Sequence, residues 1–428
     1  MLSPGVVERP LLMLNENDLR RIHQLENNLE YLSDLKSFFI DNFDIGWGVL
    51  STLTGFLREP VPDLQDQRNK NMVEKTLIGA AQVYFSVLNH LKRERFDEVY
   101  FFNGRFASLR AVMRACEKVG VRFFAHERGS DKDRYQLFQN SLPHDIIQTN
   151  LFIRSAWEAA TSNPDREMIA SKFFLDSSAG ISHSWYSFTS EQKKGLLPSD
   201  WDESKHNLVI FVSSEDEFVA IDETWLNPIY VDQNDGIRRI VHSLTGNDDF
   251  HIYLRVHPNL KGFDNTQTRF LNSLTAEHLT VIGADSPISS YALMAKATKV
   301  LTFGSTVGIE ATFWGKPSIL AGRSLYQDLE ATYNPKTHNE LMDLLSKNLP
   351  PKPKLGALMY GYYFTTRGKT FIYFRADGFY AGSFFSKNDE KFHVLSPDAR
   401  PIRSRLRISY LKRQFRKMTG PINKFVEK

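Results

Sequence analysis

The feature that most constrains this chain is a regular alternation of short apolar runs with helical patterns after residue 205. The apolar runs are typical of strands and lie at 207–212, 250–256, 279–282, 299–303 and 318–320. The helical patterns lie at about 225–245, 264–276, 288–296, 305–314 and 336–347. Strands that alternate with helices predict a doubly wound parallel sheet.

A second α/β unit precedes this region. Residues 98–102 and 121–125 are typical of strands, and a helical pattern at 107–119 lies between them and ends at Gly120. The composition then shifts at 195–205 toward turn-forming and charged residues, which is typical of a domain boundary. The 428 residues are enough for two or three domains, so we expect an α/β protein with more than one domain.

The composition excludes several classes of protein. Hydrophobic residues make up 42% and charged residues 24% of the chain, as in a globular protein, and no segment is apolar for the length that a bilayer requires. Residues 1–14 lack the basic start and apolar core of a signal peptide, so we expect an intracellular protein. The single cysteine, Cys116, excludes an internal disulfide, and its helical surroundings favour a buried apolar role over that of a nucleophile.

The stretch 300–320, VLTFGSTVGIEATFWGKPSIL, has the features of a phosphate site. A strand breaks at Gly304, Ser305 and Thr306 follow, and a helical pattern begins directly afterwards. Backbone N–H groups and hydroxyls meet at such a turn, which suits a phosphate, although either hydroxyl would equally serve as a simple helix cap. Glu310 lies in the first turns of that helix, where it either complements the helix dipole or accepts hydrogen bonds from a ribose.

Two further strand ends carry polar side chains. Arg255 and His257 close one expected strand, and Pro258 restricts His257 to an extended backbone that directs its imidazole into the crevice at the carboxyl ends of the strands. Such a histidine either donates to a phosphate or leaving group or is satisfied within the protein. Ser213 and Ser214 follow another strand, where their hydroxyls suit a phosphate or a sugar, whereas the acidic residues next to them would repel a phosphate.

The first α/β unit places a second polar set at its own strand ends, which should face the same crevice. Glu127 is the best candidate for a general base toward a substrate hydroxyl, with His126 and Asp44 behind it. Arg105 and Arg128 suit bidentate binding of a carboxylate on a substrate. The alternative is that Glu127 simply pairs with one of these arginines inside the protein.

Several of these residues fall in motifs that resemble a known family. The motifs are Arg255-Val256-His257-Pro258, Phe303-Gly304-Ser305-Thr306-Val307-Gly308-Ile309-Glu310-Ala311 and Gly315-Lys316-Pro317. They resemble the second half of bacterial capsule polysaccharide glycosyltransferases, a group that includes Kdo transferases and is related to bacterial sialyltransferases. The resemblance covers mainly residues 205–325 and, more loosely, 103–130.

The resemblance implies a fold and a site. It implies the GT-B architecture, in which two Rossmann-like domains face each other and the C-terminal one binds most of the activated sugar. By the same resemblance, His257, Ser305 and Thr306 would hold the donor phosphate, and Glu310 would contact the ribose or the base of the nucleotide.

We expect four segments along the chain. Residues 1–200 form an N-terminal Rossmann-like acceptor domain, and residues 201–350 form a C-terminal Rossmann-like donor domain. Residues 351–400 are an aromatic-rich return segment that packs across the two domains, with a helical return favoured for 356–386. Residues 401–428 are a basic amphipathic tail, which suits an anionic membrane face or docks as a terminal helix on its own domain.

The expected function follows from the resemblance. It implies a glycosyltransferase that moves a sugar from a CMP- or UDP-activated donor, with CMP-Kdo favoured, to a surface or capsular polysaccharide. We expect a cytoplasmic protein that reaches the inner membrane face through its tail, and no nucleic-acid partner, because basic residues interleave with aromatic ones only in that tail. The alternatives are a sugar-nucleotide 2-epimerase or a non-catalytic binding protein of the same fold.

No metal and no cofactor are expected, because hydroxyls and His257 suffice for the phosphate and the nucleotide-sugar is itself a substrate. Asp131-Lys132-Asp133 has the spelling of a metal-binding Asp-x-Asp motif, but it lies in a charged loop of the first unit without the strand context of that motif.

Overall fold

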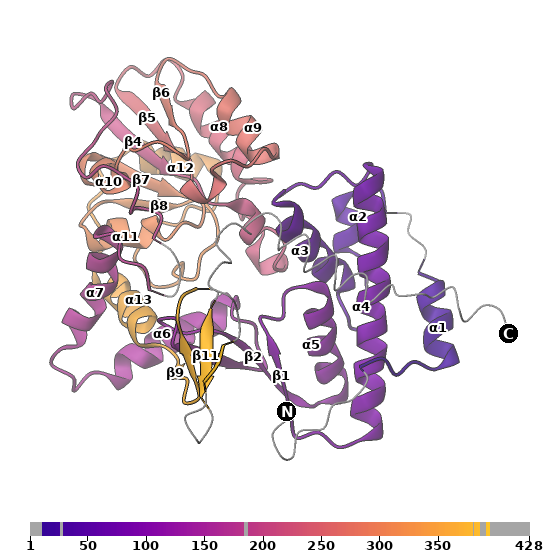
Figure 1. The fold of residues 1–428 in the computed structure, drawn as a ribbon. Coiled ribbons are helices and arrows are strands. Elements are labelled where there is room, and N and C mark those ends of the chain that lie inside the picture. The colour runs from indigo at the N-terminus through magenta and orange to yellow at the C-terminus, as the bar shows by residue number, and fades with distance from the viewer. Residues whose placement is uncertain (1–10, 26–28, 184–186, 380, 386–390, 394–428) are drawn as a thin grey trace.

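The computed structural model describes residues 11–25, 29–183, 187–379, 381–385 and 391–393. The expected basic tail at 401–428 lies outside these residues. Within the described ranges, no helix is both long and apolar enough to cross a bilayer. The described chain forms two α/β lobes, each built on its own sheet, and confirms the α/β class (Figure 1).

The first lobe is a small mixed sheet with helices packed against it. Its strand order is β1-β2-β3-β9, formed by β1 (Glu98–Phe102), β2 (Arg122–Arg128), β3 (Arg134–Gln139) and β9 (Lys369–Thr370). β1 and β2 are parallel, as the expected strand-helix-strand unit requires, whereas β3 is antiparallel to both of its neighbours. The helices of this part are α1 (Glu16–His23), α2 (Leu32–Lys36), α3 (Ile45–Leu57), α4 (Gln67–Arg93) and α5 (Ala107–Val119).

Local chemistry fixes the unit between β1 and β2. Gly120 adopts a left-handed φ of 79° and its N–H donates to the Cys116 carbonyl at 2.8 Å, which ends α5 where the sequence predicted. Cys116 is fully buried, and burial raises the pKa of its thiol to about 12. The expected apolar role of this cysteine is therefore confirmed.

The second lobe is a five-stranded, fully parallel sheet, as predicted. Its order is β6-β5-β4-β7-β8, formed by β4 (His206–Phe211), β5 (Phe250–Arg255), β6 (Leu279–Ile282), β7 (Lys299–Thr302) and β8 (Ser318–Leu320). The connecting helices are α8 (Gln233–Ser243), α9 (Thr266–Ser273), α10 (Ser290–Lys296), α11 (Val307–Phe313) and α12 (His338–Ser346). Short 3₁₀ helices follow two of the strands at Glu215–Glu217, Glu223–Trp225 and Pro258–Leu260.

Three helices join the lobes: α6 (Ile146–Ala159), α7 (Arg166–Ser178) and α13 (Leu355–Thr366). Together with α11 they form one buried apolar cluster, in which the ring of Phe174 stacks on that of Phe313 at 4.2 Å. The chain then returns to the first lobe, where β9 pairs with β3. These helices therefore hold segments that are far apart in the sequence, 146–178 and 307–366, in a single core.

The return segment differs in part from the helix that was expected at 356–386. The helix α13 ends at Thr366, and Gly368 then turns the chain with a φ of 89°. The residues that follow form a third, antiparallel sheet of β10 (Phe374–Ala376), β11 (Gly382–Phe385) and β12 (Lys391–His393). Gly368 and the aromatic content beyond it explain the change, because aromatic residues favour strands and a left-handed residue ends a helix.

The N-terminal region also differs from expectation. The apolar spacing of residues 15–40 predicts one amphipathic helix, whereas the structure has the two short helices α1 and α2 there. The chain turns after α2 so that the Gly46 N–H donates to the Phe38 carbonyl at 3.1 Å. Gly46 permits this close backbone approach, because a Cβ there would lie 1.6 Å from the Leu35 carbonyl oxygen.

Asp44 lies directly before α3, and the structure places it in an ion-pair cluster. Its carboxylate contacts Arg110 and pairs with Arg114 at 2.7 Å, and Arg110 also donates to the Ile221 carbonyl of the second lobe at 2.8 Å. Burial alone would raise the pKa of Asp44, but hydrogen bonds and charges from both arginines outweigh it and hold the pKa well below the usual range. Asp44 thus makes a structural contact with two arginines, and its expected place behind a catalytic base stays a prediction.

Replacing Asp44 by Asn should lower the free energy of unfolding by about 3 kcal/mol at pH 7, because the buried Arg110 guanidinium loses its counterion. A carboxylate whose pKa is depressed by folding contributes its stability above its unfolded pKa of about 3.9. The difference between wild type and variant should therefore persist down to about pH 4 and shrink only at lower pH. Urea denaturation at several pH values measures this.

The matched control is Glu117→Gln, which removes the half-exposed carboxylate that pairs with Arg114 at 2.7 Å. It should change the stability by less than about 1 kcal/mol, because partly exposed ion pairs contribute little. Equal effects of the two substitutions would contradict a structural role for Asp44.

Candidate functional site

Parallel strand pairing brings the predicted donor-side residues to one edge of the second sheet. β4 is bonded to β5 on one side and to β7 on the other, with Phe211 level with Arg255 and Thr302. The residues that follow these three strands therefore lie next to one another. A Cβ built on Gly304 would lie 3.8 Å from the Ser213 hydroxyl, which shows how closely the ends of β4 and β7 approach.

The two serines after β4 have different surroundings. The Ser213 hydroxyl is buried and has no hydrogen-bond partner within the described residues, although the Ser213 N–H donates to Gln233 Oε1 at 2.9 Å. The Ser214 hydroxyl donates to Asp216 at 2.8 Å and accepts from Arg58 at 3.2 Å. Ser213 is therefore the unused hydroxyl at this edge, and Ser214 is tied into a cluster of charged residues.

The turn after β7 confirms only part of the helix-cap interpretation. Ser305 Oγ accepts from the Val307 N–H at 3.3 Å, and the Ser305 carbonyl accepts from the buried Tyr326 hydroxyl at 2.6 Å. Thr306 begins the helix without a side-chain cap and is exposed. Ser305 is thus held from two sides, whereas the Thr306 side chain lies at the open surface.

Glu310 is buried in this helix. Its carboxylate accepts from the Tyr291 hydroxyl and, at 3.3 Å, from the Thr306 hydroxyl. Burial raises its pKa, and the two hydrogen bonds offset part of that rise. Both oxygens have protein partners here, and contact with a ribose stays a prediction.

His257 is held in one tautomer at the end of β5. Its Nδ1 accepts from the Asn259 N–H at 3.1 Å, so the neutral ring carries its proton on Nε2. Burial and the charges of Arg255 and Arg58 lower its pKa to about 4. At neutral pH, His257 therefore presents an Nε2–H donor, and its backbone is extended before Pro258 as predicted.

Arg255, two residues before His257, is bonded to the backbone of a neighbouring loop. Its buried guanidinium donates to the carbonyls of Gly283 at 2.6 Å and Ser286 at 3.1 Å, which fixes the loop after β6. Burial lowers its pKa to about 10. The structure thus uses Arg255 to hold a loop and, through its charge, to keep His257 neutral.

On the first lobe, Glu127 is bonded to its neighbours. Its Oε2 accepts from Asn103 Nδ2 at 2.8 Å and its Oε1 from the Arg128 N–H at 3.0 Å. The Arg128 side chain donates to the Phe379 carbonyl at 3.3 Å, and the exposed His126 ring lies 5.4 Å from that of Phe102. A role for Glu127 as a base, and for His126 and Arg128 as acceptor ligands, stays a prediction.

Arg105 does cross to the second lobe. Its guanidinium donates to the Glu217 carbonyl and lies 4.7 Å from the Phe106 ring. Burial lowers its pKa, and the charge of Glu217 opposes that shift. Arg105 therefore reaches the loop after β4, and its role as a ligand of a substrate carboxylate stays a prediction.

Sequence reasoning missed Arg58 and His144. Arg58 follows α3 with a left-handed φ of 57°, and its Nε lies 3.0 Å from the buried Asp216 carboxylate. His144 precedes α6; its Nδ1 is buried without a described partner, and burial together with the charge of Arg105 lowers its pKa to about 3. The signal in the sequence that could have revealed a basic partner was the acidic run 215–217 after β4, because buried acidic side chains require one.

The Asp-x-Asp spelling at 131–133 has a structural use. Asp131 accepts from the Asp133 N–H at 2.9 Å, and Asp133 accepts from the Ala376 N–H at 2.7 Å, which anchors β10. Across the described part of the chain, no three His, Cys, Asp or Glu residues gather closely enough to hold a metal ion.

Comparison with known protein families finds a match for one segment of the chain. Residues 226–356 match the family described as "Capsule polysaccharide biosynthesis protein". No curated protein matches the chain.

Solved structures are similar only in part. The β-Kdo 2,4-transferase of Thermosulfurimonas dismutans KpsC is 12% identical, with a TM-score of 0.42 over 70% of this chain and 85% of that one. The β-Kdo 2,7-transferase of the same KpsC is 13% identical, with a TM-score of 0.38 over 76% and 89%. A putative UDP-N-acetylglucosamine 2-epimerase from Listeria monocytogenes is 12% identical, with a TM-score of 0.27 over 69% and 78%.

These TM-scores lie below 0.5, so the three structures carry no weight for the function of this chain. The matched segment contains β5 to β8, with His257, Ser305, Thr306 and Glu310. The segment 226–356, which holds these motifs, is thus similar to the family described as "Capsule polysaccharide biosynthesis protein", as the motifs indicated.

Proposed function

We propose that this protein is a glycosyltransferase that moves a sugar from a nucleotide-activated donor to a surface or capsular polysaccharide without a metal ion. The observation that supports this most is the edge of the second sheet. There the Nε2–H donor of His257 and the Ser213 and Ser305 hydroxyls follow three adjacent parallel strands. Ligands of open α/β sheets bind at this edge.

Each of these residues has a chemical role in the proposal. The Ser213, Ser305 and Thr306 hydroxyls bind oxygens of the donor phosphate, and His257 Nε2–H donates to the oxygen that leaves with the nucleotide. Negative charge develops on that oxygen as the sugar bond breaks, so a fixed N–H donor stabilises the transition state more than the ground state.

The acceptor side of the proposal rests on the first lobe. Glu127 takes the proton of the acceptor hydroxyl, and Arg105 orients an acidic substrate group from the lobe interface. A CMP-activated donor of the CMP-Kdo type is favoured, because the motifs resemble Kdo transferases. The tail at 401–428 would bring the enzyme to an anionic membrane face on the cytoplasmic side.

The experiment that tests this function has two steps. A thermal-shift screen over CMP, CDP, UDP, GDP and their sugars identifies the donor class, because a ligand that binds only the folded state raises the unfolding temperature. The donor is then incubated with and without a capsular oligosaccharide. Transfer requires the acceptor, whereas release of an epimerised product without any acceptor would contradict transferase activity.

Replacing His257 or Ser305 by Ala should abolish transfer and leave the fold intact, because both side chains lie at the edge of the sheet rather than in its core. Incorporation of labelled sugar and the unfolding temperature measure the two effects. Ser346→Ala, at an exposed serine on α12, is the control and should keep full activity. Full activity in both site variants would refute the assignment.

Two further substitutions separate the two nitrogens of His257. Asn at this position keeps an acceptor for the Asn259 N–H but has no donor that reaches the cleft, whereas Gln keeps a donor near the place of Nε2. His257→Gln should therefore retain about tenfold more activity than His257→Asn, consistent with one hydrogen bond to a charged group. Steady-state transfer rates measure the ratio.

The pH dependence should follow the depressed pKa of His257. The neutral ring persists until the pH falls through about 4, so the ratio of wild-type to His257→Gln rates should stay constant between about pH 5 and pH 8. A ratio that changes near pH 6.5, the ordinary histidine value, would contradict the neutral-donor role.

A further inference from the structure

One arginine of the first lobe, Arg58, reaches the edge of the second sheet at which we propose that the donor phosphate binds. Arg58 ends α3, and its guanidinium lies between Ser214 at 3.2 Å, Asp216 at 3.0 Å and Glu217 at 3.6 Å. The side chain is 12% exposed, and its guanidinium carbon lies 4.8 Å from the Phe263 ring centroid. Arg58 is therefore a buried cation contributed by the opposite lobe.

Most of the hydrogen-bonding capacity of Arg58 is unused. An arginine has five N–H donors, yet only Nη2 donates a hydrogen bond within the described residues, to the Ser214 hydroxyl. Its Nε is buried without a well-aligned acceptor, although the Asp216 carboxylate is near. A guanidinium held in this way is ready for an anion that supplies two or three oxygens.

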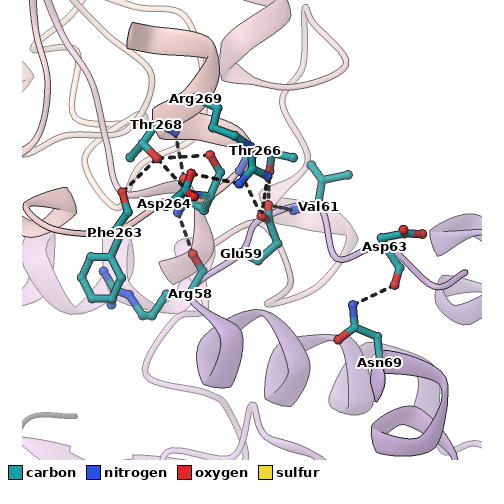
Figure 2. Close-up of polar contacts among 11 residues, drawn as sticks. Arg58, Glu59, Val61, Asp63, Asn69, Phe263, Asp264, Thr266, Thr268 and Arg269 are labelled. Carbon is teal, nitrogen blue, oxygen red and sulfur yellow. Dashed lines mark hydrogen bonds and ion pairs between the residues drawn. The ribbon is translucent and has the colours of Figure 1, made fainter. Parts of the chain in front are cut away.

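The residue after Arg58, Glu59, makes its own separate contact with the second lobe. Glu59 accepts from the Thr266 N–H at 2.9 Å and from the Thr266 hydroxyl, so it caps α9 of the other lobe, and Arg269 lies 3.7 Å from the same carboxylate. The Arg58 carbonyl accepts from Asn265 at 2.6 Å. Figure 2 shows Arg58 beside the Phe263 ring and Glu59 facing Thr266 and Arg269.

The charge of Arg58 reaches the site itself. Its guanidinium contributes to the lowered pKa of His257, so the two residues are within electrostatic range of each other. The acidic residues after β4 would repel a phosphate if they stood alone. Arg58 and Arg105 approach these acids from the first lobe and offset their charge.

We propose that Arg58 is a ligand of the donor phosphate, supplied by the first lobe and held in place by Asp216 when no donor is bound. This proposal rests on the proposed function and adds a residue to the same site. The phosphate would take the unused N–H donors of Arg58 and replace its long contact with Glu217. Donor binding would then also strengthen the contact between the lobes.

The test compares nucleotides with nucleosides. Calorimetry measures the binding of CMP, UDP, cytidine and uridine to wild type, Arg58→Gln, Arg58→Lys and Glu59→Gln. Arg58→Gln should weaken binding of the nucleotide at least about tenfold and leave the matching nucleoside within about twofold, because only the phosphate loses a charged partner. Arg58→Lys, which keeps the charge but not the fork, should fall between them.

Glu59→Gln is the matched control, because it alters the adjacent residue at the same lobe interface but not the phosphate edge. It should keep the wild-type ratio of nucleotide to nucleoside affinity. Unfolding temperatures of all variants verify that each is folded. If Arg58→Gln does not fold, the nucleotide and nucleoside affinities of Arg58→Lys decide the outcome.

Three results would overturn the proposal. Unchanged nucleotide affinity in Arg58→Gln and Arg58→Lys would exclude the phosphate contact. Equal weakening of nucleotide binding and nucleoside binding would show that Arg58 only maintains the contact between the lobes. Wild-type protein that binds neither CMP nor UDP would overturn the proposed function as well, and this outcome is distinct because it appears before any substitution is made.

Discussion

Parallel hydrogen bonding of β4 to both β5 and β7 is the constraint on which the candidate site depends. It aligns three strands so that the residues just beyond them, far apart in the chain, come to one edge. Each adds one group there: Ser213 a hydroxyl without a partner among the described residues, His257 a neutral ring with Nε2–H, and Ser305 a hydroxyl on a residue whose carbonyl is bonded to Tyr326. No single loop carries the site.

The first lobe contributes positive charge to this edge of the second sheet. Arg58, Arg105 and Arg110 each reach a group of the second lobe between Ser214 and Ile221. The Arg110 contact is buried and the Arg58 contact is partly buried, and in such surroundings charges interact strongly and an unpaired one is costly. The relative position of the lobes and the electrostatics of the edge are therefore set by the same residues. A substitution at this interface acts on both.

The sequence predicted the parallel sheet well, because its strands are short, apolar and regularly separated by helices. It also placed His257 and Ser305 shortly after strand ends, as the structure has them, whereas their role in binding stays a prediction. It was less informative about residues whose role depends on distant partners: Asp44 pairs with arginines of α5, Arg255 holds the loop after β6, and Arg58 belongs to no motif. Charge pairing between segments far apart in the chain leaves no local pattern, so these roles required the structure.

Hydrogen–deuterium exchange with and without the nucleotide that stabilises the protein most would test the location of the site directly. The account predicts slower exchange in the loops that follow β4, β5 and β7, at residues 213–217, 257–260 and 304–308. Protection confined to another surface, such as the pocket lined by Gln67, Lys70 and Glu74 at the start of α4, with these loops unchanged, would contradict it.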